Sequence, residues 1–107
     1  MIRVMIERHC KPGKEEELEK LSIDLRSRAM HYPGYISGET LQSAGDPTHW
    51  MVISTWISEE HWAAWQRTPN RRSVMNNVEP LLSSPEKVEI YHFTKRAISS
   101  SAHTVDR

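Results

Sequence analysis

The order of two hydrophobic periodicities along the chain constrains its fold more than any other feature. Residues 2–7 alternate between apolar and polar side chains, which is typical of a half-buried β-strand. Residues 14–30 repeat apolar side chains every three or four positions behind a run of glutamates, which predicts an amphipathic helix. A Pro-Gly pair ends this helix, and two strands are predicted at residues 35–43 and 49–56, joined as a hairpin by a short turn.

The second half of the chain carries two helix-start signals and one more strand. Ser58 is placed to cap a short helix that contains two tryptophans. Thr68, followed by Pro69 at the first helical position, predicts a second helix over residues 69–78. A loop bracketed by two prolines follows, and residues 87–94 form the last predicted strand.

The resulting order of elements is βαββαβ. This order predicts an α+β fold, in which a ferredoxin-like antiparallel sheet carries the helices on one face. We expect one domain over residues 1–95. The remaining residues, 96–107, are rich in serine and have little to bury, so they are expected to form a polar C-terminal tail.

The predicted sheet is apolar on both faces. In the third strand Trp50 and Val52 point to one side while Met51 and Ile53 point to the other. A face that the helices leave uncovered needs a second cover, and another copy of the chain is the simplest one. We therefore expect a homodimer joined through the open sheet faces, with three candidate interface residues: Met5, Tyr91 and Phe93.

Charge and cysteine content exclude several classes of function. Lys and Arg total 14 and Asp and Glu total 14, so no positive excess suggests a nucleic-acid partner. The single cysteine, Cys10, cannot form an internal disulfide, and charges interrupt the apolar N-terminal stretch, so neither a signal peptide nor a membrane anchor is expected. The histidines show no spacing typical of a metal site. We expect a cytoplasmic protein without metal or cofactor.

Three segments, KPGKEEELEKL, YPGYISGETLQS and WMVISTWISEEHWAAWQRTPNRR, give the chain a resemblance to a known family. In this order and spacing they resemble the antibiotic biosynthesis monooxygenase family, whose members are dimeric α+β barrels. The resemblance covers residues 2–94. It implies a small-molecule pocket between the helices and the sheet of each subunit, with Trp65 in its wall.

The resemblance also implies a chemistry for this pocket. The quinone-forming monooxygenases of the family oxidise polycyclic phenols without metal or flavin, and an asparagine lies one helical turn before the tryptophan. In this sequence that position is His61, on the same helix face as Trp65. Because an imidazole accepts a proton, we expect His61 and Trp65 to be the catalytic pair, with His61 deprotonating a phenolic substrate. Five further residues are expected to line the substrate pocket: Val4, Ile6, Trp62, Arg72 and Met75.

Two observations limit this interpretation. For haem degradation the family pattern has an asparagine on the first strand and a histidine ten residues after the tryptophan. This chain has Ile6 and Met75 at those places, so haem is not expected. The helix tryptophans are also typical of an ordinary core, and the basic cluster Arg67, Arg71 and Arg72 suits either an anionic ligand or a solvated surface.

The sequence leaves three functions open. The leading hypothesis is a cofactor-independent monooxygenase acting on a small aromatic or electron-rich substrate. The alternatives are a non-catalytic small-molecule-binding or stress-related module of the same fold, and an enzyme that processes a signalling molecule. A closed, tryptophan-lined cavity would favour the small-molecule functions, and a cavity filled by side chains would favour the inert module.

Overall fold

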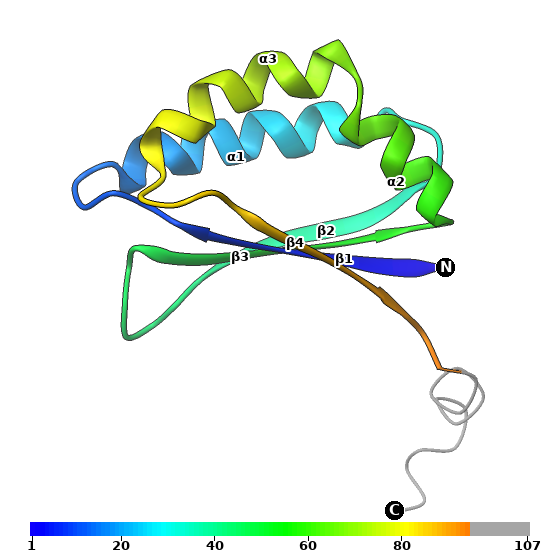
Figure 1. The fold of residues 1–107 in the computed structure, drawn as a ribbon, viewed down its shortest axis with the longest axis horizontal. Coiled ribbons are helices and arrows are strands. Elements are labelled where there is room, and N and C mark those ends of the chain that lie inside the picture. The colour runs from blue at the N-terminus through cyan, green and yellow to red at the C-terminus, as the bar shows by residue number, and fades with distance from the viewer. Residues whose placement is uncertain (95–107) are drawn as a thin grey trace, which may run out of the picture.

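The computed structural model describes residues 1–94 and has the predicted element order (Figure 1). The strands and helices are β1 (Ile2–His9), α1 (Glu15–Ala29), β2 (Tyr35–Gln42), β3 (His49–Trp56), α2 (Glu59–Gln66), α3 (Pro69–Val78) and β4 (Lys87–His92). A short 3-10 helix, η1 (Glu79–Leu81), begins the segment that was predicted to be a loop, and β4 ends before Phe93. The predicted tail, residues 96–107, lies outside the described residues.

The four strands form one antiparallel sheet in the order β2-β3-β1-β4, and the three α-helices pack on one of its faces (Figure 1). This arrangement confirms the predicted ferredoxin-like α+β fold. Strand β1 is central and pairs with β3 on one side and β4 on the other. Because neighbouring strand residues point to opposite faces, β1 presents one set of side chains to the helices and another to the open face.

The hydrophobic core lies between the helices and the sheet. Ile2, Val4 and Ile6 of β1 are almost fully buried against the helices. The helices contribute apolar side chains at spacings of three and four residues: Leu18, Leu25 and Ala29 from α1, and Val74, Met75 and Val78 from α3. Each fully buried large side chain in such a layer stabilises the fold by about 1.5–3 kcal/mol relative to an exposed one.

Two side-chain caps define where α2 and α3 begin. The Ser58 hydroxyl accepts a hydrogen bond from the His61 backbone N–H at 3.2 Å, and the Thr68 hydroxyl accepts one from Arg71 at 3.0 Å. Pro69 occupies the first turn of α3. These bonds satisfy donors that a helix start otherwise leaves unpaired, so both helices begin where the sequence predicted.

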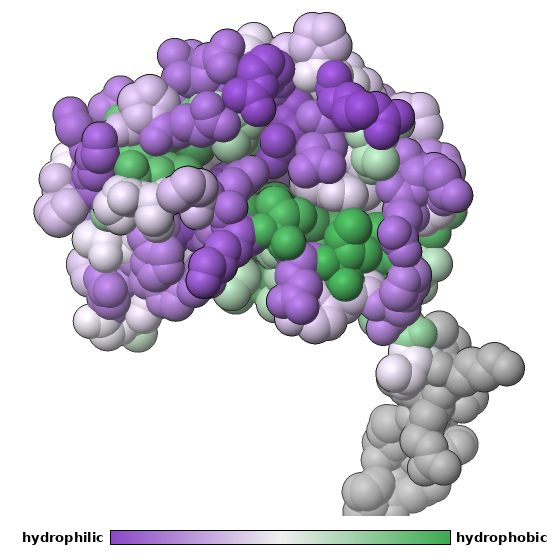
Figure 2. Space-filling model, in the orientation of Figure 1, coloured by the Kyte–Doolittle hydropathy of each residue, from purple (hydrophilic) through white to green (hydrophobic). Residues whose placement is uncertain are grey.

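The open face of the sheet carries a mixture of apolar and charged groups. Met5 and Tyr91 lie on this face, as their register requires, and the Arg3 guanidinium lies 5.9 Å from the centre of the Phe93 ring. Hydrophilic side chains cover the outer side of the helices, whereas hydrophobic surface gathers below them over the strands (Figure 2). Within residues 1–94, no helix is both long and apolar enough to cross a membrane.

Candidate small-molecule site

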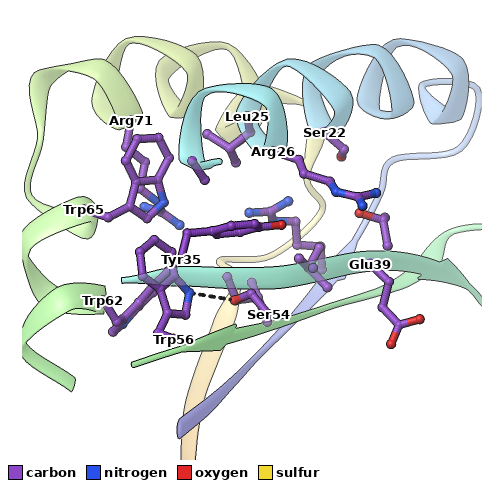
Figure 3. A pocket seen from close by; sticks show the side chains of 16 residues that line it. Ser22, Leu25, Arg26, Tyr35, Glu39, Ser54, Trp56, Trp62, Trp65 and Arg71 are labelled. Carbon is purple, nitrogen blue, oxygen red and sulfur yellow. Dashed lines mark hydrogen bonds between the residues drawn. The ribbon is translucent and has the colours of Figure 1, made fainter. Parts of the chain in front are cut away.

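A cavity of about 50 Å³ lies between the three helices and the helix-covered side of the sheet (Figure 3). Its wall is largely aromatic, with Tyr35, Trp56, Trp62 and Trp65 in the lining. A wider hollow of about 360 Å³ lies beside it, between α1 and the edge strand β2. The two spaces are neighbours and have three lining residues in common: Ser22, Arg26 and Thr40.

Ring contacts hold the aromatic wall in place. The centres of the Trp56 and Trp62 rings are 5.8 Å apart and those of Tyr35 and Trp56 are 5.4 Å apart, both in edge-to-face geometry. The indole N–H of Trp56 donates to the Ser54 hydroxyl at 3.1 Å (Figure 3). Such pairs add about 0.5–1.5 kcal/mol beyond the area they bury, so they help to hold the rings of the wall against one another.

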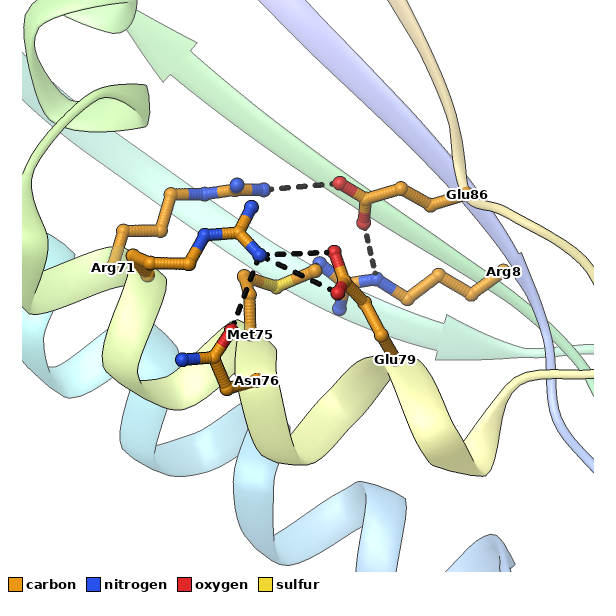
Figure 4. A network of polar contacts seen from close by, with 7 residues as sticks. Arg8, Arg71, Met75, Asn76, Glu79 and Glu86 are labelled. Atoms are coloured by element: carbon orange, nitrogen blue, oxygen red, sulfur yellow. Dashed lines mark hydrogen bonds and ion pairs between the residues drawn. The ribbon is translucent and has the colours of Figure 1, made fainter.

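Two buried arginines share one carboxylate beside this wall. Arg8 donates to one oxygen of Glu86 at 2.9 Å and Arg71 to the other at 3.2 Å (Figure 4). The two arginine side chains are 2% and 4% exposed. Arg8 and Arg71 line the cavity but Glu86 does not, so the network presents an excess of positive charge to the cavity. Arg71 also lies 5.5 Å from the centre of the Trp62 ring.

The charges of this network shift each other's pKa values. Burial alone would raise the pKa of Glu86, but the positive charges and hydrogen bonds of Arg8 and Arg71 outweigh it and lower that pKa. Burial lowers the pKa of Arg71, and the negative charge of Glu86 partly offsets this effect. An arginine side chain remains protonated in a folded protein, so the network is ionised at neutral pH.

Two hydroxyl groups in the cavity lining have no hydrogen-bond partner among residues 1–94. The Ser22 and Tyr35 hydroxyl oxygens are buried, and neither forms a hydrogen bond within the described residues. A buried polar group without a partner costs about 1–3 kcal/mol, so such groups are rare unless a ligand or water satisfies them. Both are therefore candidate ligand-binding groups.

A bulge in β2 places the Tyr35 hydroxyl. The register of β2 against β3 shifts between Tyr35 and Ser37, and as a result both Tyr35 and Gly38 face the helices. A Cβ atom at Gly38 would lie 2.5 Å from the Tyr35 hydroxyl oxygen. The glycine is therefore required for the tyrosine side chain to lie where it does.

Five of the residues that the sequence predicted for the site are buried between the helices and the sheet. Trp65, Trp62 and Ile6 line the cavity. Val4 and Met75 are buried in the adjoining core but do not line it.

The structure places Arg71, rather than its predicted neighbour Arg72, in the cavity lining. Successive helix residues differ by about 100° in direction, so Arg72 points outward. There it pairs with Glu79 at 3.2 Å, and both side chains are 54% exposed.

His61 does not share the cavity with Trp65. Its ring nitrogen Nδ1 lies 2.7 Å from the Ser58 hydroxyl, and its ring covers Gly34, where a Cβ atom would collide with it. Gly34 has a positive φ of 89°, which glycine adopts without strain. The contacts of His61 therefore belong to the junction between the Pro-Gly turn and α2.

Comparison with known proteins identifies the family. The sequence profile described as antibiotic biosynthesis monooxygenase matches residues 1–77. Protein SchA of Streptomyces halstedii is 27% identical over 79 residues, which are 74% of this chain and 21% of that protein. The 42.8 kDa protein in the whiE locus of Streptomyces coelicolor is 29% identical over 80 residues, 75% of this chain and 19% of that protein. The chain thus spans about a fifth of the length of these relatives.

Solved structures share the fold at lower identity. A putative antibiotic biosynthesis monooxygenase from Nitrosomonas europaea has a TM-score of 0.80 at 22% identity, covering 84% of this chain and 86% of that one. SnoaB, a cofactor-independent oxygenase from Streptomyces nogalater, has a TM-score of 0.76 at 12% identity, covering 85% and 91%. Together with the profile match, these findings show that the chain belongs to the antibiotic biosynthesis monooxygenase family.

Proposed function

We propose that this chain is a cofactor-independent monooxygenase that binds a small, electron-rich aromatic substrate as its anion. The observation that carries the proposal is the set of unmet polar groups in an aromatic-lined cavity. Arg8 and Arg71 share one carboxylate, and the hydroxyls of Ser22 and Tyr35 have no hydrogen-bond partner in the part of the chain that the structure describes. A phenolate matches this set, because its oxygen accepts hydrogen bonds while its ring stacks against tryptophan.

The arginines supply the first chemical step in this proposal. Positive charge in a site of low dielectric favours the ionised form of a bound phenol, so Arg8 and Arg71 would lower its pKa. The phenolic proton would pass to water in the hollow between α1 and β2. The proton-accepting role expected of His61 is not part of the proposal, since its ring lies outside the lining.

The electron-rich anion would then react with molecular oxygen. In a quinone-forming reaction one oxygen atom enters the ring, and the other leaves as water with the phenolic hydrogen and the displaced ring hydrogen. The protein's contribution is to hold the anion and to orient it against Trp62 and Trp65. SnoaB, which is described as a cofactor-independent oxygenase, supports this reaction type through its shared fold.

The proposed substrate needs more room than the aromatic-lined cavity provides. The cavity measures about 50 Å³, whereas an engineered cavity that binds benzene measures about 150 Å³. We infer that the ring enters from the hollow between α1 and β2 and displaces the Tyr35 side chain. The Tyr35 hydroxyl has no hydrogen bond to lose in this movement.

Binding of phenols and of their methyl ethers tests the proposal. Quenching of tryptophan fluorescence without oxygen measures affinity, and uptake of labelled oxygen into product measures turnover. Arg71→Met should weaken phenol binding at least tenfold and leave binding of the neutral ethers unchanged, because it removes a cavity charge but leaves the Arg8–Glu86 pair. Arg72→Met, on the outer surface, is the matched control. Equal effects of the two variants would contradict the proposal.

One observation favours a non-catalytic binding module instead. Among the described residues that line the cavity, the only carboxylate is Glu39, and its side chain points away from the cavity in Figure 3. A binding module would show the same dependence on Arg71 without oxygen uptake. Tight binding of phenols with no labelled oxygen in product would favour this alternative.

We further propose that two copies associate through their open sheet faces. Exposed apolar groups of the open face support this assembly, because Leu41 of β2 is 48% and Tyr91 of β4 is 46% exposed. Sedimentation at micromolar concentration should show a dimer, and Met5→Glu should shift it toward monomer. Ile23→Glu changes an exposed residue of α1 and is the control. A monomeric unmodified chain would contradict the assembly.

A further inference from the structure

Strands β1 and β3 bring three potential metal ligands together on the open face. His9 and His49 lie directly opposite each other in the strand register, and their rings stack with centres 4.7 Å apart and planes 8° apart. The Glu7 carboxylate oxygen Oε2 lies 2.8 Å from Nε2 of His49 and 3.5 Å from Nε2 of His9. One ligand atom from each residue lies within 4.8 Å of the other two.

These separations are close to those of a coordinated set. Zinc binds imidazole nitrogen and carboxylate oxygen at about 2.0–2.2 Å, so tetrahedral ligand atoms lie about 3.3 Å from one another. The two nitrogen-to-oxygen distances, 2.8 and 3.5 Å, bracket that value. The two stacked rings must tilt toward a common point to bind one ion, and their side chains are 41% and 37% exposed.

We propose that Glu7, His9 and His49 form a binding site for one divalent transition-metal ion of the zinc class. Two imidazoles and one carboxylate suit zinc, iron, cobalt, nickel or copper, whereas magnesium and calcium prefer oxygen ligands alone. Three protein ligands leave a coordination position for water or a further ligand. All three come from one chain, so the ratio is one ion per chain whether or not a second copy covers this face.

The backbone around both histidines is anchored. The carbonyl oxygen of His9 accepts hydrogen bonds from the backbone N–H and the hydroxyl of Ser83, at 2.8 and 3.2 Å. The His49 N–H donates to the Asp46 carbonyl at 3.0 Å, in a turn where the Asp46 carboxylate accepts from Thr48. Metal binding therefore needs to restrict only side-chain rotation, because the backbone is already held in place. This lowers the entropic cost of binding.

Titration of Zn²⁺ into the full chain tests the site, with Co²⁺ absorption reporting coordination geometry and Mg²⁺ as the oxygen-preferring comparison. The unmodified chain should bind one Zn²⁺ per chain and no Mg²⁺. His9→Ala and His49→Ala should each weaken Zn²⁺ binding at least about tenfold. His92→Ala is the matched control, because His92 is an exposed histidine that pairs with a carboxylate elsewhere, Glu59 at 2.8 Å.

Each outcome decides the proposal. A tenfold or greater loss in both ligand variants, with binding retained in His92→Ala, supports it. Absence of saturable Zn²⁺ binding in the unmodified chain, or equal affinity in all three histidine variants, overturns it. Should a histidine variant fail to fold, Glu7→Gln removes the third ligand with little change of shape and is expected to give the same loss.

Discussion

Glu7 and Arg8 are neighbours in β1, yet they belong to two charge clusters of opposite character. Arg8 points under the helices and pairs with Glu86, with side chains 2% and 16% exposed. Glu7 points to the open face and pairs with His49, with side chains 29% and 37% exposed. One strand therefore carries a nearly dry charge network on one face and a hydrated one on the other.

The comparison shows that burial, rather than distance, separates the two clusters. The Arg8–Glu86 contact is 2.9 Å and the Glu7–His49 contact is 2.8 Å. In the dry network each charge depends on its partner, because an unpaired buried charge has no water to solvate it. In the hydrated cluster water replaces a lost partner, which leaves the side chains free to exchange it for a ligand.

The largest effect should follow from removing the shared carboxylate. Glu86→Gln keeps the side-chain shape but leaves Arg8 and Arg71 together without a counter-charge, so we expect a loss of about 3 kcal/mol in the free energy of unfolding. Glu79→Gln breaks the exposed pair with Arg72 and should cost less than about 0.5 kcal/mol. Urea denaturation measures both, and equal losses would break the comparison.

A smaller effect of the same network should appear in acid. The pKa of Glu86 is lowered from its ordinary value of 4.5. A carboxyl with a lowered folded-state pKa contributes stability above its unfolded pKa and loses it as pH falls through the folded value. The free energy of unfolding should therefore fall below about pH 4.5, and fall less steeply in Glu86→Gln. Parallel pH profiles would contradict this assignment.

Gly38→Ala tests the cavity side of the sheet more gently. The added Cβ would lie 2.5 Å from the Tyr35 hydroxyl oxygen, so the ring must move, at a cost of about 1 kcal/mol. In Tyr35→Phe the nearest remaining atoms are 3.5 and 3.6 Å away, which is ordinary contact. The cost of Gly38→Ala should then be less than half as large. Additive losses in a double-mutant cycle would argue against the close approach.

Sequence periodicity predicted the fold because the local signals along the chain specify the same elements that the sheet and the core require. The alternation of β1 and β3, the caps Ser58 and Thr68, and Pro69 at a helix start each specify the observed element. The same periodicity contained a signal for the site. Arg8 continues the inward positions of β1, and Arg71 shares the buried face of α3, so both are charged residues in core positions.

Other features of the cavity and of the proposed metal site depend on strand pairing, which the sequence does not show. Tyr35 and Gly38 share a face only because the β2 register shifts between them. His9 and His49 are far apart in the chain and meet only through the register of β1 with β3. The family resemblance and helix spacing predicted His61 in the cavity, but its ring contacts Ser58 and Gly34 instead.

The smallest stability effect should come from the same carboxylate-to-amide change on the open face. The pKa of Glu7 is lowered chiefly by its hydrogen bond with His49, so the carboxylate contributes stability above its unfolded pKa and loses it in acid. Water and salt screen this half-exposed pair, and an amide still hydrogen-bonds to imidazole. Glu7→Gln should therefore lower the melting temperature of the metal-free chain only slightly at neutral pH, while reducing the rise that Zn²⁺ produces in the unmodified chain. Differential scanning calorimetry with and without Zn²⁺ measures both. A loss as large as that of Glu86→Gln would contradict the assignment of Glu7 to a hydrated cluster.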